Sequence, residues 1–220
     1  MNDNQMKTCK MKRLAFIMML GCTFCMAHAQ NLRNHRYSSG KELKVLEELV
    51  DQFCRYVEIV GSTDSYSESI KNKIRNDSVK PLFYKYEQRK MITTNSYGTS
   101  TKPMLQYFRN LQVQASKPKN ISADKTEITY QLDFEFAGEN GKLIWDYSHT
   151  EDDGSKVYIA TVYIYQTYMK KTSRGYETIR NRTEVDKKEM KVRKVVIPTT
   201  NKEIIKLYDV TRAESLHKEG

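Results

Sequence analysis

Residues 127–136 read EITYQLDFEF, and this stretch decides the fold class. Its apolar residues stand at every second position, which is the period of a β-strand with one buried face and one exposed face. The apolar positions are Ile128, Tyr130, Leu132, Phe134 and Phe136, and the polar positions are Glu127, Thr129, Gln131, Asp133 and Glu135. Such a strand is stable only beside further strands and under a covering layer.

Strand-like composition continues towards the C-terminus. Segments rich in Val, Ile, Thr and Tyr lie at 142–150, 156–170, 176–185, 188–199 and 204–210. Turns separate these segments, and Asp153-Gly154 is a strong hairpin signal. Consecutive strands joined by short turns predict an antiparallel sheet. The polar residues 212–220 are predicted to form a loose C-terminal tail.

Helical periodicity fills the N-terminal third. Ser39 and Glu42 have the spacing of a capping box, and Gly61 follows the last apolar residue as a C′ glycine would. Between them, apolar residues recur at intervals of three and four: Leu43, Leu46, Val50, Phe53, Val57 and Val60. We therefore expect an amphipathic helix over 41–60. Shorter helices are expected over 66–76 and, after Pro103, over 104–111, and a strand-like segment over 82–94.

Helices followed by consecutive strands are typical of one fold class. The predicted class is α+β, with N-terminal helices packed on a curved antiparallel sheet. A single domain would cover 40–211, because no repeat and no linker divides this range and its length suffices for one hydrophobic core. Residues 30–39 precede this domain as a short polar tail.

Residues 1–29 have the organisation of a secretory signal peptide. A positive segment at 10–13 precedes an apolar run at 14–20, and Ala27-His28-Ala29 supplies the small residues of a cleavage site. We expect export to the periplasm or the exterior after cleavage near Ala29. The alternative is a lipoprotein, because Met19-Leu20-Gly21-Cys22 is similar to a lipobox, and membrane association is expected only if Cys22 is lipidated.

Charge and cysteine content limit the partners. The chain has a formal net charge of +10, of which the basic leader holds a part. In an exported protein this charge favours anionic surfaces or solubility, and nucleic acid fits the charge but not the location. Of the four cysteines only Cys54 lies outside the leader, so neither a disulfide nor a cysteine zinc site is expected. Cys54 falls on the apolar face of the first helix, as a small buried hydrophobe does.

The order of a long helix, two short helices and long meandering strands over about 41–210 resembles the nuclear transport factor two-like superfamily. The resemblance rests on element order and strand composition, and it implies a cystatin-like α+β roll with a conical pocket between the helices and the concave sheet face. Members include cyclases and dehydratases as well as non-catalytic binding and dimerisation modules. Fold alone does not choose among these functions.

Aromatic residues of the predicted strands are candidates for lining such a pocket: Tyr130, Trp145, Tyr147, Tyr163 and Tyr165, with His149 beside them. Their apolar bodies and polar tips suit ligand orientation, and the alternative is a core that these rings fill. Asp133 and His149 on neighbouring strands would suit general acid–base chemistry. The strand phases, however, put Asp133 on the polar face and His149 on the apolar face, so the two are expected to point apart.

A basic run between 170 and 194 is the candidate anion-binding surface, with Arg180, Arg182, Lys191 and Arg193 as its main residues. It would bind an acidic polysaccharide, a lipid phosphate or an acidic partner. The alternative is a solvated strand face whose charges protect an edge from aggregation. Asp152-Asp153-Gly154 lacks the spaced oxygen ligands of a calcium loop and suits a turn, so neither a metal nor a cofactor is expected.

These observations favour an exported, non-catalytic binding or interaction module of unknown ligand, associated as a homodimer through its aromatic sheet. The first alternative is a small pocket enzyme of the cyclase or dehydratase type. The second is an envelope lipoprotein that contacts an anionic surface polymer through the basic hairpin. The sequence contains none of the glycine-rich phosphate loops, paired-cysteine metal motifs, serine-hydrolase elbows or zinc-protease signatures that mark the common enzyme classes.

Overall fold

The computed structural model describes residues 35–63, 66–95, 98–116, 127–139, 142–172, 175–178 and 184–217. The chain divides into two units, residues 1–36 and 37–220, and the second carries the fold described below. The short strand β1 (His35–Tyr37) spans the boundary in sequence. The predicted signal peptide, with Ala29 and Cys22, lies outside the described residues.

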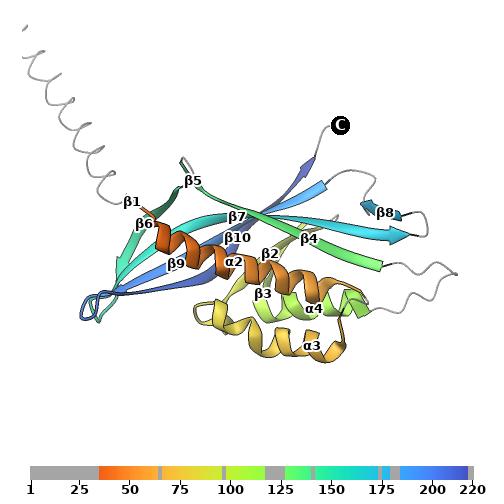
Figure 1. Ribbon diagram of the computed structural model, residues 1–220, viewed down its shortest axis with the longest axis horizontal. Coiled ribbons are helices and arrows are strands. Elements are labelled where there is room, and N and C mark those ends of the chain that lie inside the picture. The colour runs from red at the N-terminus through yellow and green to blue at the C-terminus, as the bar shows by residue number, and fades with distance from the viewer. Residues whose placement is uncertain are drawn as a thin grey trace, which may run out of the picture. The chain divides into compact units, whose positions relative to one another are not determined.

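β7 (Lys156–Thr172) is the central strand of the sheet (Figure 1). One edge of β7 pairs with β9 (Glu184–Ile197), and β10 (Lys202–His217) continues the sheet beyond β9. The other edge pairs first with β6 (Lys142–Thr150) and then with β4 (Glu127–Phe136). The short strands β5 (Gly138–Glu139) and β8 (Gly175–Thr178) pair with β6 and β7. All of these pairings are antiparallel, as predicted.

The helices pack against one face of this sheet (Figure 1). α2 (Gly40–Gly61) and α4 (Met104–Ser116) contact each other, and α3 (Glu68–Lys73) continues into a π-helical turn (Ile74–Ser78) beside them. Two 3₁₀ turns (Lys80–Leu82 and Tyr86–Gln88) then lead into a separate hairpin of β2 (Lys90–Asn95) and β3 (Gly98–Pro103). The predicted α+β class is confirmed.

Alternation along β7 and β9 divides their side chains between two faces. The even-numbered residues between 160 and 166 of β7 and between 188 and 194 of β9 are buried and face the helices, as Val162 and Met190 show. We call this side the helix-covered face. Odd-numbered residues lie on the opposite side, which we call the outer face. The aromatic side chains of the core include Phe53, Phe83, Phe108 and Trp145.

The start of α2 follows the prediction, and its end differs. Ser39 accepts a hydrogen bond from the Glu42 N–H at 3.3 Å, and Glu42 accepts one from the Ser39 N–H at 2.5 Å, so the capping box is confirmed. Gly61 is the last residue of α2 rather than a C′ residue, and the cap is Ser62. A Cβ at Gly61 would lie 2.4 Å from the Tyr130 ring. The glycine therefore permits close approach of a strand residue to the helix.

Two further segments differ from the predictions. Residues 82–94 were expected to be strand-like, but the chain turns before β2, since Lys85 adopts a left-handed conformation with φ of 49°. The third helix runs to Ser116, beyond the expected end at 111. No helix within the described residues is both long enough and apolar enough to span a membrane.

β10 continues to His217, so the prediction of a loose tail is wrong for residues 212–217. The pairing with β9 is irregular between Leu207 and Arg212, which breaks the two-residue period of the sequence. Beyond this point polar side chains predominate, yet the backbone stays in register with β9 as far as the His217–Glu184 pair. Backbone hydrogen bonds thus extend a strand that the hydrophobic pattern does not reveal.

Candidate ligand-binding site

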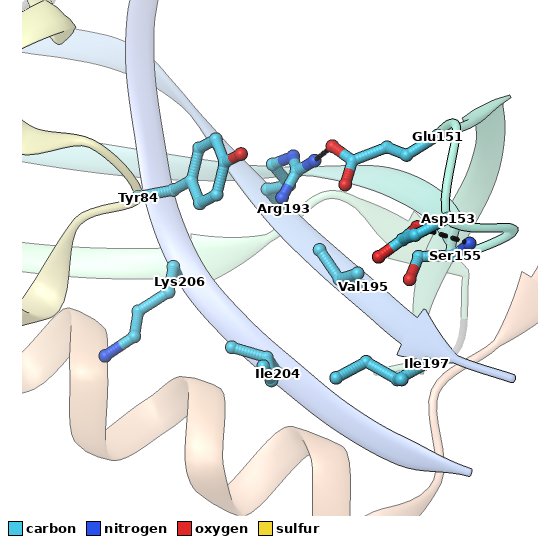
Figure 2. Close-up of a pocket in the computed structure, with 9 residues that line it drawn as sticks. All are labelled: Tyr84, Glu151, Asp153, Ser155, Arg193, Val195, Ile197, Ile204 and Lys206. Carbon is cyan, nitrogen blue, oxygen red and sulfur yellow. Dashed lines mark hydrogen bonds and ion pairs between the residues drawn. The ribbon is translucent and has the colours of Figure 1, made fainter. Parts of the chain in front are cut away.

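A hollow lies on the outer face, at the end of the sheet where β6 turns into β7 (Figure 2). Its volume is about 190 Å³, and it is partly open to solvent. The lining residues come from the turn after β6, from β9, from β10 and from the segment before β2: Tyr84, Glu151, Asp153, Ser155, Arg193, Val195, Ile197, Ile204 and Lys206. The volume is smaller than the roughly 300–1,000 Å³ of a drug-sized ligand pocket, so it suits a ligand of one ring or one side chain.

The turn at 151–155 holds one wall of the hollow. The Glu151 N–H donates to the Ser155 carbonyl at 2.9 Å, and the Gly154 N–H donates to the Glu151 carbonyl at 2.9 Å. Asp153 Oδ1 accepts the Ser155 N–H at 2.9 Å, as an aspartate in an Asx-type turn does. Gly154 has φ of +80°, a conformation that favours glycine. The Asp-Gly signal of the sequence therefore fixes the positions of Glu151 and Ser155.

Arg193 forms the centre of the hollow. Its guanidinium pairs with the Glu151 carboxylate, and its Cζ lies 3.8 Å from the centroid of the Tyr84 ring. The Arg193 side chain is 5% exposed, whereas Glu151 is 35% exposed. Figure 2 shows the phenol ring beside the guanidinium and the carboxylate reaching it from the turn. Pairing and stacking together compensate for the removal of the cation from water.

Tyr84 reaches the hollow because its segment is attached to β10. The Tyr84 N–H donates to the Leu207 carbonyl at 3.0 Å, and Phe83 forms a parallel bridge with Leu207. Lys206 adds a second attachment, since its Nζ donates to the Pro81 carbonyl at 2.5 Å. These bonds hold the aromatic wall on the edge strand of the sheet.

The floor of the hollow is apolar, and one buried hydroxyl faces it. Val195 and Ile197 of β9 lie beside Ile204 of β10 on the outer face. Ser155 is 1% exposed, and its Oγ has no hydrogen-bond partner. Figure 2 shows this hydroxyl directed towards the side chains of the floor. A buried hydroxyl without a partner is unfavourable, and a ligand that hydrogen-bonds to it would remove the deficit.

The ionic groups of the hollow balance one another. Glu151 and Asp153 are acidic, and Arg193 and Lys206 are basic. The hydrogen bond from the Ser155 backbone N–H lowers the pKa of Asp153, so this carboxyl is ionised at neutral pH. The hollow therefore combines hydrogen-bonding groups of both kinds with no net charge.

The aromatic residues predicted to line a pocket do not lie together. Tyr130 and Trp145 are buried on the helix-covered face, and Tyr147 is 41% exposed beside Tyr158. Tyr163 and Tyr165 lie on the outer face, opposite Glu189 and Lys187 of β9. None of the five lines the hollow of Figure 2. Tyr130 donates to Gln114 Oε1 at 3.2 Å and covers Gly61, so its role within the described residues is core packing.

Asp133 and His149 do not form a catalytic pair. A register shift in β6 brings His149 opposite Val157, and Asp133 stands opposite Tyr165. Both residues thus lie on the outer face, and the expectation that they point to opposite faces is wrong. Their partners are eight residues apart on β7, which corresponds to roughly 26 Å along a strand.

The basic candidates are only partly within the described residues. Arg180 and Arg182 lie outside them. Lys191 is on the outer face and donates to Thr161 Oγ1 at 2.7 Å. Arg193 lines the hollow and pairs with Glu151, so both described candidates are already engaged.

Two lysine side chains of β9 are buried on the helix-covered face, away from the hollow. Lys194 pairs with Glu42 at 2.5 Å, with its Nζ 4.7 Å from the centroid of the Trp145 ring. Burial alone would raise the pKa of Glu42, but hydrogen bonds from Lys194 and Ser39 lower it overall. Lys188 donates to Gln166 Oε1, and burial lowers the pKa of Lys188 to about 8.

The prediction that Cys54 is a small buried core residue is confirmed. Its side chain is buried in the core, and burial raises the pKa of the thiol to about 12. A thiol of this kind is a poor nucleophile at neutral pH, because the thiolate is the reactive form. Cys54 therefore acts as a small core residue.

Sequence reasoning missed most of the hollow. Tyr84, Glu151 and Ser155 attract no attention in the sequence, and Asp153 was assigned only to turn chemistry. One signal was present: Val195, Val196 and Ile197 are apolar on both faces of one strand. An apolar outer face at this point indicates a covered or ligand-binding surface.

No family model, no curated protein and no solved structure matches this chain. The resemblance to the nuclear transport factor two-like superfamily therefore stays a prediction. Function has to be inferred from the geometry of the hollow.

Proposed function

We propose that this chain is an exported, non-catalytic binding module whose ligand site is the hollow on the outer face. One observation carries the proposal: the Ser155 hydroxyl is buried without a partner at the wall of a hollow with an apolar floor. Small-ligand sites combine an apolar lining with a few fixed polar groups, and this hollow has both.

The chemistry of the lining favours binding over catalysis. General acid–base catalysis requires a group whose pKa lies near the working pH, and the pKa of Asp153 is lowered away from that range. The Glu151 carboxylate is held by Arg193, and the Ser155 Oγ has no base within hydrogen-bond distance to activate it. Lys188, whose pKa is near 8, belongs to the core on the other face.

Small amphipathic fragments test the proposal directly. A ¹⁵N-labelled protein titrated with a set of water-soluble fragments, each with one ring and one polar group, should show amide shifts at Ser155, Val195 and Ile204. Val195→Phe fills the hollow and should abolish these shifts. Thr161→Phe, a matched change elsewhere on the outer face, should leave them intact. Shifts that survive Val195→Phe, or no shifts at all, would refute the site.

Export is tested separately. Mass spectrometry of the protein recovered from its host should show a chain that begins at Gln30. A lipid adduct on Cys22 would instead support the lipoprotein alternative. Turnover of a cyclase or dehydratase substrate that Val195→Phe abolishes would favour the enzyme alternative.

A further inference from the structure

We propose that the hollow binds a neutral, hydroxyl-rich ligand, namely a single sugar residue of a glycan. This inference rests on the proposed binding function and adds the chemical class of the ligand. It follows from three properties of the lining: its balanced charge, its adjacent hydrogen-bond donors and acceptors, and its apolar floor.

The balanced charge disfavours an ionic ligand. A carboxylate that displaced Glu151 from the Arg193 guanidinium would lie beside two further carboxylates of the lining, Glu151 and Asp153. An ammonium group that captured Glu151 would leave the 5% exposed Arg193 without its partner. Breaking the pair in this way is unfavourable, because the Arg193 cation stays buried without its carboxylate. A neutral ligand leaves the pair intact.

Hydroxyl groups complement the polar wall. Each hydroxyl donates one hydrogen bond and accepts others, so one group can donate to a carboxylate while it accepts from a guanidinium. Glu151 and Asp153 supply acceptors, Arg193 supplies donors, and the Ser155 Oγ lacks a partner. Figure 2 shows these groups on one side of the hollow, within a single turn and the adjacent strand.

The apolar floor complements the carbon skeleton of the ring. Val195, Ile197 and Ile204 form a patch that the C–H face of a pyranose can cover. A purely apolar ligand would cover the floor but would leave the Ser155 hydroxyl unpaired. A small linear polyol would satisfy the hydroxyl without covering the floor. A ring that carries hydroxyls on its edge and C–H groups on its face satisfies both.

The test compares neutral sugars with charged fragments of similar size. The ¹⁵N-labelled full chain is titrated with methyl glycosides of glucose, galactose, mannose and N-acetylglucosamine, and separately with n-butylammonium and butyrate. At least one glycoside is expected to shift the amides of Ser155, Val195 and Ile204, and the charged fragments are expected to leave them unchanged. Ser155→Ala removes the hydroxyl and adds no atom to the buried site, and it should weaken glycoside affinity about tenfold, a loss typical of a hydrogen bond to a buried group.

Thr161→Val is the matched control, because Thr161 lies on the outer face of the same strand, outside the hollow. Its glycoside affinity should equal that of the unaltered protein. Binding of butylammonium or butyrate without any glycoside would overturn the sugar assignment and leave the binding function standing. If neither class of probe nor the amphipathic fragments shift these amides, both proposals fail. Glycoside affinity that Ser155→Ala leaves unchanged would also overturn the assignment.

Discussion

Lys194 and Arg193 are neighbours in β9, yet their side chains lie on opposite faces of the sheet. Both are almost completely buried, both pair with a glutamate, and both lie against aromatic rings. The glutamates differ: Glu42 is 3% exposed in the core, whereas Glu151 is 35% exposed at the rim of the hollow. The same chemistry is enclosed on the helix-covered face and accessible on the outer face. Position relative to the helices therefore decides whether such a pair is enclosed in the core or lies at an open hollow.

The largest change in stability is expected when the two ion pairs are broken one at a time. Glu42→Ala leaves the Lys194 ammonium buried without its partner, so it should lower the free energy of unfolding by about 3–5 kcal/mol. Glu151→Ala should lower it by a smaller amount, about 1–3 kcal/mol, because the buried Arg193 loses its carboxylate partner but keeps the Tyr84 ring beside it, and the hollow is partly open to solvent. Urea denaturation followed by the fluorescence of Trp145, the single tryptophan, measures both.

Equal losses from the two substitutions would contradict the comparison. They would show that the Arg193 pair supports the fold as much as the Lys194 pair does. The refolded Glu42→Gln variant provides a second measurement, since it keeps a hydrogen-bond acceptor for Lys194 and should lose less stability than Glu42→Ala.

The next effect concerns Lys188, which lies on the helix-covered face, and Lys187, which lies on the outer face. Burial lowers the pKa of Lys188 from 10.5 to about 8, so the unfolded chain binds more protons than the folded chain between these values. The free energy of unfolding should therefore rise with pH across this window, by about 3 kcal/mol in full. Measurements should use a Cys54→Ala background and stop near pH 10, because burial raises the pKa of Cys54 and of Tyr107, and ionisation of these groups in the unfolded chain opposes the trend.

Lys188→Met should remove this rise, and Lys187→Met should retain it. The Lys187 Nζ lies 3.9 Å from the centroid of the Tyr163 ring on the outer face, where water can solvate it. Urea midpoints measured at intervals between pH 7 and pH 10 give the slope for each variant. A slope unchanged by Lys188→Met would assign the pH dependence to another group.

A smaller effect is expected where α2 meets β4. Gly61→Ala places a methyl group against the Tyr130 ring and should cost about 1–3 kcal/mol of stability, as overpacking of a core does. Gly40→Ala is the matched control at the other end of α2, since a Cβ there meets nothing within 4 Å. Thermal unfolding of the two variants should therefore separate them. Tyr130→Leu added to Gly61→Ala should restore part of the loss, and a failure to do so would mean that the methyl group acts elsewhere.

The helix-covered face was largely predictable from the sequence, and the outer face was not. The apolar spacing of α2, its capping box and the alternation of β4 all depend on local patterns, and all three are confirmed. The hollow depends on contacts between distant segments: Tyr84 stacks on Arg193, and Arg193 pairs with Glu151. The spacing of apolar residues along the sequence gives no information about contacts between distant segments. Tyr163 and Trp145 were grouped as pocket residues because composition alone cannot tell on which face a ring lies.

The sequence also did not reveal where a strand changes phase, that is, where its side chains exchange faces of the sheet. The shift in β6 between Tyr147 and His149 moves every later side chain to the other face, and nothing in the sequence marks it. The irregular pairing of β10 hides the strand beyond Val210 in the same way. Errors in the sequence interpretation thus gather where a strand changes phase, and the hollow lies next to such a place.

The smallest expected effect separates the shape of the hollow from the stability of the fold. Gly154 has φ of +80°, and alanine in this left-handed region costs about 1–2 kcal/mol. In the Gly154→Ala variant, a change in the backbone conformation of the turn relieves this strain. Such a change displaces Glu151 and Ser155, because hydrogen bonds within the turn hold both residues. Trp145 lies in the core on the opposite face, so its fluorescence in the folded state should not change. Fragment binding at Val195 should be lost while the Trp145 emission maximum stays constant. Amide spectra with and without the fragment measure the binding, and a fluorescence scan measures the emission maximum. If binding at Val195 persists in the Gly154→Ala variant, the turn does not shape the site, and the floor of β9 and β10 alone must hold the ligand.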